Sequence, residues 1–306
     1  MNKRNRLLSV PLFALLSVMA GQGVAKVDIL ACEPEWAALA EELGRDRVSV
    51  VSATTAYQDP HHIEARPSLI ARARNADLVT CTGAELEVGW LPLLLRQSGN
   101  TRIQQGKPGY FLASEQVPLL ETLEKVDRSM GDIHAAGNPH VHLDPYRLLD
   151  IAEALTQRLK TIDESNRQYY QDNFDRFADQ WQAAIKEWER KAEELRGKKA
   201  IVQHRSWSYL LTWLGIDVLA DLEPRPGLPP TSGHLAKLLE TTEKTPPDFI
   251  LIASYQNDRG AQWLARRSEA PLVSLPYTVG GNERAQDLFS LYNNTLELLL
   301  AEIEDD

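Results

Sequence analysis

The chain contains only two cysteines among its 306 residues. Two cysteines allow a single disulfide bond, so the protein is not one of the small domains that a disulfide framework holds together. The sequence also lacks internal repeats and low-complexity tracts, and 43% of its residues are hydrophobic. Burial of that much apolar surface can offset the entropy lost on folding, which excludes disorder as the main state. The length allows about two domains of ~150 residues, each with its own core.

Positive charge is also scarce. There are 33 Lys and Arg residues against 43 Asp and Glu, and three of the positive residues lie within the first 25. The remainder carries 30 positive and 43 negative residues, a net charge of −13 with histidines neutral. Such a surface repels phosphate backbones and anionic lipids, so we expect no nucleic-acid partner and no membrane-surface role. It is suited to attracting cations.

Long hydrophobic runs are confined to the N-terminus. Leu7 to Ala20 is apolar, positive residues precede it, and the small residues at 23–25 offer a cleavage site before Lys26. This pattern predicts a signal peptide over residues 1–25 and export to a bacterial periplasm, with an uncleaved N-terminal anchor as the alternative. The run is shorter than the ~20 residues of a spanning helix. No cysteine stands at the cleavage point, so we expect no lipid anchor.

Short apolar segments alternate with helical patterns along the rest of the chain. In the first half we expect strands over 27–31, 48–51, 77–81 and 110–113, and helices over 33–43, 67–75 and 84–97. In the second half we expect strands over 200–203, 217–220, 249–253 and 272–275, and helices over 206–214, 233–242, 260–267 and 283–304. This alternation predicts parallel sheets covered by helices on both faces. An irregular loop rich in proline is expected over Glu223–Pro230.

A long helical region separates the two halves. Asp144 and Pro145 form a good helix start, because the aspartate can cap free amides and the proline suits the first turn. From there to about Gly197 the pattern is helical, with a turn near 163–165. A helix over Asn166–Leu195 would be ~45 Å long, enough to run along two lobes. The predicted fold class is therefore α/β, with two lobes joined by a long backbone helix: an N-terminal lobe over 26–144, a helical segment over 145–197 and a C-terminal lobe over 198–306.

Seven histidines are the candidate functional residues: His61, His62, His134, His140, His142, His204 and His234. Neutral imidazole is the commonest protein ligand for metals such as zinc. In open α/β sheets the carboxyl ends of the strands form the ligand crevice. His61 and His62 follow the second predicted strand and His204 ends the first strand of the second half, so His61 and His204 are expected to face each other.

Other interpretations of single histidines stay open, since an isolated histidine is more often a hydrogen-bonded loop or core residue. His234 lies in the first turn of a predicted surface helix and is expected to be exposed to solvent. His134 lies between two glycines and is either a flexible loop residue or a weak entry ligand. His140 and His142 are two residues apart, so an extended segment places both on one face, although only one of them need point inward.

Three segments resemble the cluster A-I solute-binding proteins, the zinc- and manganese-binding components of bacterial ABC importers. Asp59–Glu64 reads DPHHIE, with Pro67 after it, and is similar to their DPHxxE segment. Asn138–Pro145 reads NPHVHLDP and is similar to NPHxWxDP, with His142 in place of the tryptophan. Ala76–Gly83 with Glu87 resembles their third-strand segment. The resemblance covers essentially the whole chain after residue 25.

The resemblance implies two α/β lobes linked by one long helix, with a metal in the cleft. Carried over by position, it makes His61, His140 and His204 the metal ligands. A histidine at the third position is typical of the zinc branch, and three imidazoles suit Zn²⁺ better than Mn²⁺, which favours oxygen donors. The implied function is a periplasmic receptor that captures Zn²⁺ as transported ligand and delivers it to its cognate ABC permease in the inner membrane. Alternatives are a receptor for Mn, Cu or Ni; a metallochaperone partner is left open, and a monomer is the default.

The sequence departs from the family pattern at the fourth ligand. The family has an aspartate after the last strand, whereas residues 274–281 contain no carboxylate. Water is the first candidate for this position, with His62, His142 and Glu64 as the others. The long histidine-rich loop of the family is also missing.

A three-histidine zinc with an open position is also the arrangement of zinc hydrolases, because it lowers the pKa of bound water to ~7. The sequence offers no convincing general base and no nucleophile motif, so we expect no enzymatic activity. Glu64 is better suited to orienting an imidazole.

Cys32 and Cys81 end the first and third predicted strands. The strand order 2-1-3-4 that the resemblance implies makes these strands neighbours. An oxidising compartment could then join the two cysteines, and the alternative is two buried thiols that act as small hydrophobes.

Overall fold

The computed structural model describes residues 26–122 and 134–304. The predicted signal peptide, residues 1–25, lies outside this part of the chain. Within the described residues, no helix combines the length and the apolar character that a membrane span requires.

The first lobe is built on a four-stranded parallel sheet with the order β2-β1-β3-β4. Its strands are β1 (Val27–Ala31), β2 (Val48–Ser52), β3 (Leu78–Cys81) and β4 (Tyr110–Leu112). Helix α1 (Pro34–Gly44) packs on one face of this sheet, while α2 (Pro67–Asn75) and α3 (Leu91–Ser98) cover the other. Strand β3 is buried throughout and β1 at every position except Asp28, as expected for strands with helices on both faces, whereas the edge strand β2 is only partly buried.

The helix predicted over 84–97 begins later, at Leu91. Ala84 and Glu85 have left-handed backbone angles (φ 47° and 68°), which a right-handed helix cannot contain. The Glu87 carboxylate accepts hydrogen bonds from the backbone N–H groups of Thr82 and Gly83 and so stabilises a tight turn at the end of β3.

The second lobe repeats this architecture. Its parallel sheet has the order β6-β5-β7-β8, with β5 (Lys199–Val202), β6 (Asp217–Asp221), β7 (Phe249–Ala253) and β8 (Leu272–Leu275). The helices of this half are α6 (Ser208–Leu214), α7 (Ser232–Lys244), α8 (Arg259–Ser268) and α9 (Leu288–Glu304). The last helix starts five residues after its predicted start, because the Asp287 side chain accepts the N–H of Ser290 and caps it there.

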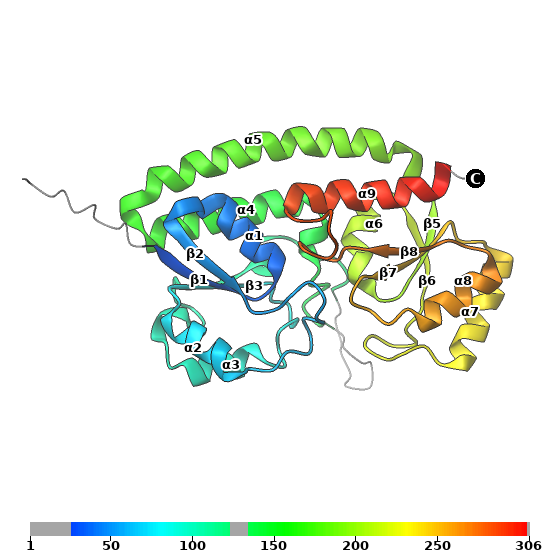
Figure 1. The fold of residues 1–306 in the computed structure, drawn as a ribbon, viewed down its shortest axis with the longest axis horizontal. Helices are drawn as coiled ribbons and strands as arrows, with labels where there is room; N and C mark the ends of the chain where they lie inside the picture. Colours follow the sequence, from blue (N-terminus) through cyan, green and yellow to red (C-terminus); the bar gives the residue numbers. More distant parts are fainter. Residues whose placement is uncertain (1–25, 123–133, 305–306) are drawn as a thin grey trace, which may run out of the picture.

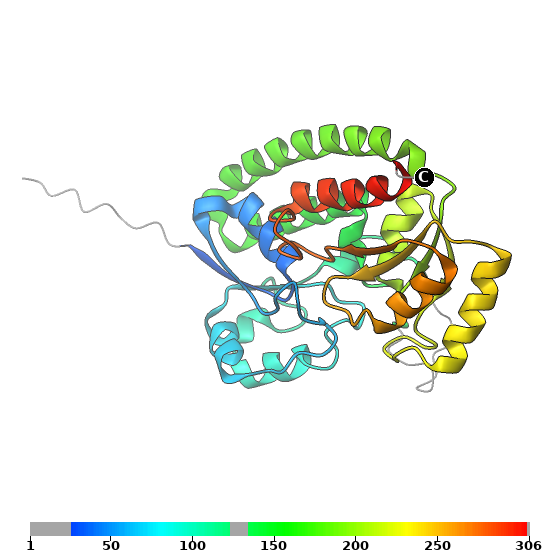
Figure 2. The ribbon, with the colours of Figure 1, turned by 45° about the vertical axis from the view of Figure 1, so that its right-hand side comes forward.

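Two helices connect the lobes, α4 (Pro145–Ile162) and α5 (Arg167–Lys191). The Asp144 side chain accepts the N–H groups of Tyr146 and Arg147, as the predicted cap requires. In Figure 1 and Figure 2, α5 passes over both lobes, with α9 beside it. This arrangement confirms the predicted fold class of two α/β lobes with parallel sheets and a long linking helix.

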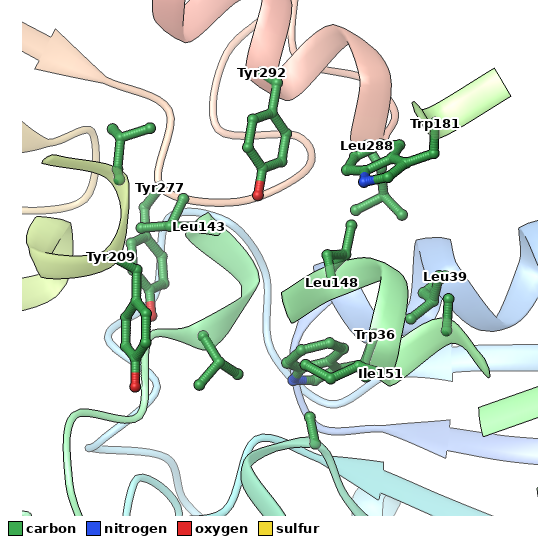
Figure 3. Close-up of a cluster of buried hydrophobic side chains, with 14 of the residues drawn as sticks. Trp36, Leu39, Leu143, Leu148, Ile151, Trp181, Tyr209, Tyr277, Leu288 and Tyr292 are labelled. Carbon is green, nitrogen blue, oxygen red and sulfur yellow. The ribbon is translucent and has the colours of Figure 1, made fainter. Parts of the chain in front are cut away.

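One hydrophobic core extends from the first lobe through α5 into the second, and each lobe has a further cluster of its own. Its aromatic centre includes Trp181 and Trp188 of α5 and Tyr292 of α9, with ring centroids 4.8–5.3 Å apart. Figure 3 shows that Trp36 of α1, Trp181 of α5 and Tyr277 after β8 belong to the same cluster. Because α5 is buried against both lobes, a wide opening motion would expose part of this core to water.

Cys32 and Cys81 form a disulfide bond across the neighbouring strands β1 and β3. Both cysteines are fully buried. The pairing that the implied strand order allowed is therefore present, and these sulfur atoms are not available as metal ligands.

Candidate metal centre

Three loops bring His61, His140 and His204 together at the cleft between the lobes. His61 lies in the loop after β2, His140 in the segment before α4, and His204 two residues after the end of β5. Because the two sheets point their carboxyl ends at the cleft, histidines distant in sequence become neighbours there.

The coordinating atoms of these three histidines all lie within 4.8 Å of one another. The ring centroids are 5.7 Å apart for His61 and His204, 5.7 Å for His140 and His204, and 6.0 Å for His61 and His140. The interplanar angles are 66°, 82° and 83°, so the rings converge with their edges and do not stack. Small movements would bring three nitrogens to the ~2.0–2.1 Å that a zinc ion requires.

A different neighbour holds the Nδ1 atom of each ring. The Asp59 carboxylate lies 2.7 Å from Nδ1 of His61, and the Glu223 carboxylate lies 2.8 Å from Nδ1 of His204. The Tyr277 hydroxyl lies 2.7 Å from Nδ1 of His140. Partners of this kind fix the tautomer and the orientation of a ligating histidine and leave its Nε2 for the metal. The Nε2 atom of His140 is buried and has no hydrogen-bond partner.

Burial and mutual repulsion keep the site in the form that binds cations. Burial lowers the pKa of His140 well below its ordinary value, and the neighbouring His204 and His61 lower it further. Burial also raises the pKa of Asp59, but its hydrogen bond and charge interaction with His61 outweigh that effect and leave the pKa below the ordinary value. Metal binding requires a neutral imidazole, and the ionised Asp59 carboxylate favours it by holding the proton on Nδ1 of His61.

Tyr277 occupies the stretch where the family carries its carboxylate. Burial and the nearby Glu35 raise the pKa of this phenol well above its ordinary value, so it remains neutral. Its oxygen is directed at Nδ1 of His140. Tyr277 therefore orients a histidine and does not replace the carboxylate as a charged ligand.

The other candidates for a fourth ligand lie outside this cluster. Glu64 and His62 are exposed, and the ring centroid of His62 is 6.2 Å from that of His61. His142 is buried but engaged elsewhere, with Nε2 3.0 Å from the Tyr277 carbonyl and Nδ1 3.3 Å from the Glu35 carboxylate. His234, expected to be exposed, is partly buried, and its Nε2 contacts the Asp221 carbonyl.

His142 belongs to a buried polar network between the lobes. Thr278, from the second lobe, donates a 2.5 Å hydrogen bond to the same Glu35 carboxylate of α1 that His142 approaches. The network lies behind His140 and joins α1, the segment before α4 and the loop after β8. His142, at the position where the resemblance has a tryptophan, is thus part of a polar network in this chain.

Sequence reasoning missed the three residues that orient the ligands. Asp59 was visible two residues before His61, a spacing that allows its side chain to reach the ring. Glu223 follows β6 and Tyr277 follows β8, so their positions after strand ends could have identified them as residues near the site. Asp59, Glu223 and His62 also line an open pocket of about 610 Å³ beside the site, together with Arg259.

Comparison with known proteins finds binding proteins of metal-uptake systems, some named for zinc and some for manganese. Residues 29–302 match the family model of the zinc-uptake complex component A, periplasmic (ZnuA). The high-affinity zinc uptake system protein ZnuA of Bacillus subtilis (strain 168) is 24% identical over 251 residues, which cover 81% of this chain and 77% of that protein. The manganese ABC transporter substrate-binding lipoprotein PsaA of Streptococcus mitis is 21% identical over 273 residues, which cover 88% of this chain and 85% of that protein. A crystal structure of ZnuA has a TM-score of 0.75 at 21% identity and covers 90% of this chain and 99% of that one, so the fold is shared.

Proposed function

The chain belongs to the family of periplasmic component A proteins of zinc-uptake complexes, and from this membership we propose that it captures Zn²⁺ at His61, His140 and His204 and delivers it to an ABC permease of the inner membrane. As a member of this family it is a metal-binding transport protein that acts outside the cytoplasm with a permease partner, and not an enzyme. The metal, the ligands and a periplasmic location are the parts that we propose.

The convergence of three imidazoles supports the proposal most strongly. Their coordinating atoms lie within 4.8 Å of one another, and each ring has its own Nδ1 partner. The carboxylates of Asp59 and Glu223 bind Nδ1 of His61 and His204 and so support these ligands. Nitrogen donors suit Zn²⁺, whereas Mn²⁺ prefers oxygen.

A manganese receptor is the second candidate function. The observation that favours it is the similarity to PsaA, whose name assigns it to manganese transport. The chemistry of the donor atoms distinguishes the two candidates, because a manganese site is expected to include carboxylate oxygens.

Competition titration of the metal-free protein with Zn²⁺ and Mn²⁺ tests the proposal. We expect one Zn²⁺ per chain and tighter binding of Zn²⁺ than of Mn²⁺. Alanine at His61, His140 or His204 should weaken zinc binding by more than the 10–100-fold that loss of an outer partner costs. His234→Ala is the matched control, because it removes an imidazole that is not part of the cluster and should leave zinc affinity unchanged. Tighter binding of Mn²⁺, or full zinc affinity in the alanine variants, would contradict the assignment.

A further inference from the structure

A fourth imidazole lies against the cluster. Nε2 of His134 is 3.2 Å from Nε2 of His61. Two nitrogens bound at ~2.0–2.1 Å to one tetrahedral ion are separated by about 3.3–3.4 Å. The two imidazoles therefore already have almost the spacing of two ligands of a single zinc ion.

The position of the His134 ring agrees with this spacing. Its centroid lies 5.2 Å from that of His61 and 6.4 Å from that of His140. These distances bracket the 5.7–6.0 Å that separate the rings of the triad. His134 thus adjoins the triad beside His61 and His140, although it is not among the residues whose ligand atoms all lie within 4.8 Å of one another.

The hydrogen bond between His61 and Asp59 determines which nitrogen of His61 can bind a metal beside His134. Because the Asp59 carboxylate holds a proton on Nδ1 of neutral His61, the lone pair of His61 is on Nε2, the atom that faces His134. Nδ1 of His134 is buried beside the backbone of Ala84. A cation between the two Nε2 atoms would satisfy both rings.

The backbone around His134 is anchored to the first lobe. The N–H of Ala135 donates a 2.6 Å hydrogen bond to the Glu85 carboxylate, and the N–H of Gly137 donates to the His134 carbonyl. Gly137 has φ +125°, and a Cβ there would lie 2.6 Å from Cβ of Leu119, so only glycine fits this turn. These contacts place His134 at the cleft independently of any metal.

We propose that His134 is the fourth metal ligand and that the site is an all-imidazole tetrahedron of His61, His134, His140 and His204. This inference rests on the proposed function and adds a residue that determines its specificity. A shell without oxygen donors favours Zn²⁺ and other ions that prefer imidazole, and it disfavours Mn²⁺. It also accounts for the neutral, histidine-directed Tyr277 at the position of the family carboxylate, since His134 supplies the fourth ligand in place of that carboxylate.

His134→Gln tests the proposal, because glutamine can still donate a hydrogen bond to Nε2 of His61 but carries no imidazole. The number of imidazoles bound to zinc is measured by X-ray absorption spectroscopy, and the ratio of Zn²⁺ to Mn²⁺ affinity by competition titration. We expect four imidazoles in the wild type and three in His134→Gln, with a Zn²⁺/Mn²⁺ affinity ratio at least tenfold lower. His62→Gln is the matched control and should retain four imidazoles and the wild-type ratio.

The outcomes separate this inference from the proposed function. If His61→Ala loses zinc while His134→Gln keeps the wild-type spectrum and ratio, His134 is only a structural neighbour and the inference is overturned, although the proposed function stands. If the wild type binds no zinc, both are overturned. A spectrum with three imidazoles in the wild type also overturns the inference.

Discussion

Removal of the hydroxyl of Tyr277 is expected to weaken zinc binding without removing a ligand. Tyr277 is only 2% exposed, and its hydroxyl lies 2.7 Å from Nδ1 of His140. When a metal occupies Nε2 of His140, Nδ1 carries the proton and donates a hydrogen bond to the phenol oxygen. Metal binding makes this N–H group more acidic and strengthens the bond, so its loss in Tyr277→Phe should affect the metal-bound state more than the metal-free state.

Two estimates of the size of this effect agree. Loss of an outer partner of a ligating histidine typically costs 10–100-fold in metal affinity, or about 1.4–2.7 kcal/mol. An N–H group left buried without an acceptor costs about 1–3 kcal/mol. We therefore expect the dissociation constant for Zn²⁺ to rise by about one to two orders of magnitude.

Isothermal titration in competition with a chelator measures the change. Tyr170→Phe is the matched control, because Tyr170 is a buried tyrosine whose hydroxyl donates a 2.9 Å hydrogen bond to Asp163, at the start of α5 and remote from the histidines. It should leave zinc affinity unchanged. A folded Tyr277→Phe protein whose zinc affinity lies within about twofold of the wild type would refute the reasoning.

Three further predictions concern the stability of the fold, each measured by urea unfolding of the metal-free protein. Replacement of both Cys32 and Cys81 by serine removes a link between residues 49 apart in sequence and should lower the unfolding free energy by about 4 kcal/mol; an unchanged value would mean that the bond does not restrict the unfolded chain. Trp181→Ala empties a fully buried position between the lobes and should cost about 3–5 kcal/mol, whereas a loss below about 1 kcal/mol would show that α5 is loosely packed. Burial raises the pKa of Glu87 to about 7, so its contribution to stability is complete below the unfolded-state pKa of about 4.5 and is lost as the pH rises to about 7. The wild type should therefore lose about 3 kcal/mol relative to Glu87→Gln over this range, and a pH-independent difference would contradict that pKa.

Much of the fold could be predicted from the sequence, because the apolar strand segments and the residues that start helices indicate the same elements. Phe249–Ala253 is buried throughout and Val27–Ala31 at every position except Asp28, and Pro67 and Asp144 mark helix starts that the structure retains. The start of α3 was wrong because it depends on a turn at Ala84. A left-handed backbone at alanine is set by the surrounding contacts and leaves no pattern in the sequence.

The candidate site was predictable only in part. Position at strand ends and resemblance to a known family identify His61, His140 and His204, and the structure brings these three residues together. His134 carried no comparable signal, because its approach to His61 depends on the turn at Gly137 and on the bond between Ala135 and Glu85. The sequence indicates only that the segment around Tyr277 lacks the family's carboxylate. The role of Tyr277 follows from its distance to His140.

The most direct test is a crystal structure of the zinc-loaded protein with anomalous data collected at the zinc absorption edge. We expect one anomalous peak per chain, at about 2.0–2.1 Å from Nε2 of His61, His140 and His204. A peak bonded to fewer than two of these atoms, or located elsewhere in the molecule, would contradict the claim that the three imidazoles bind one ion.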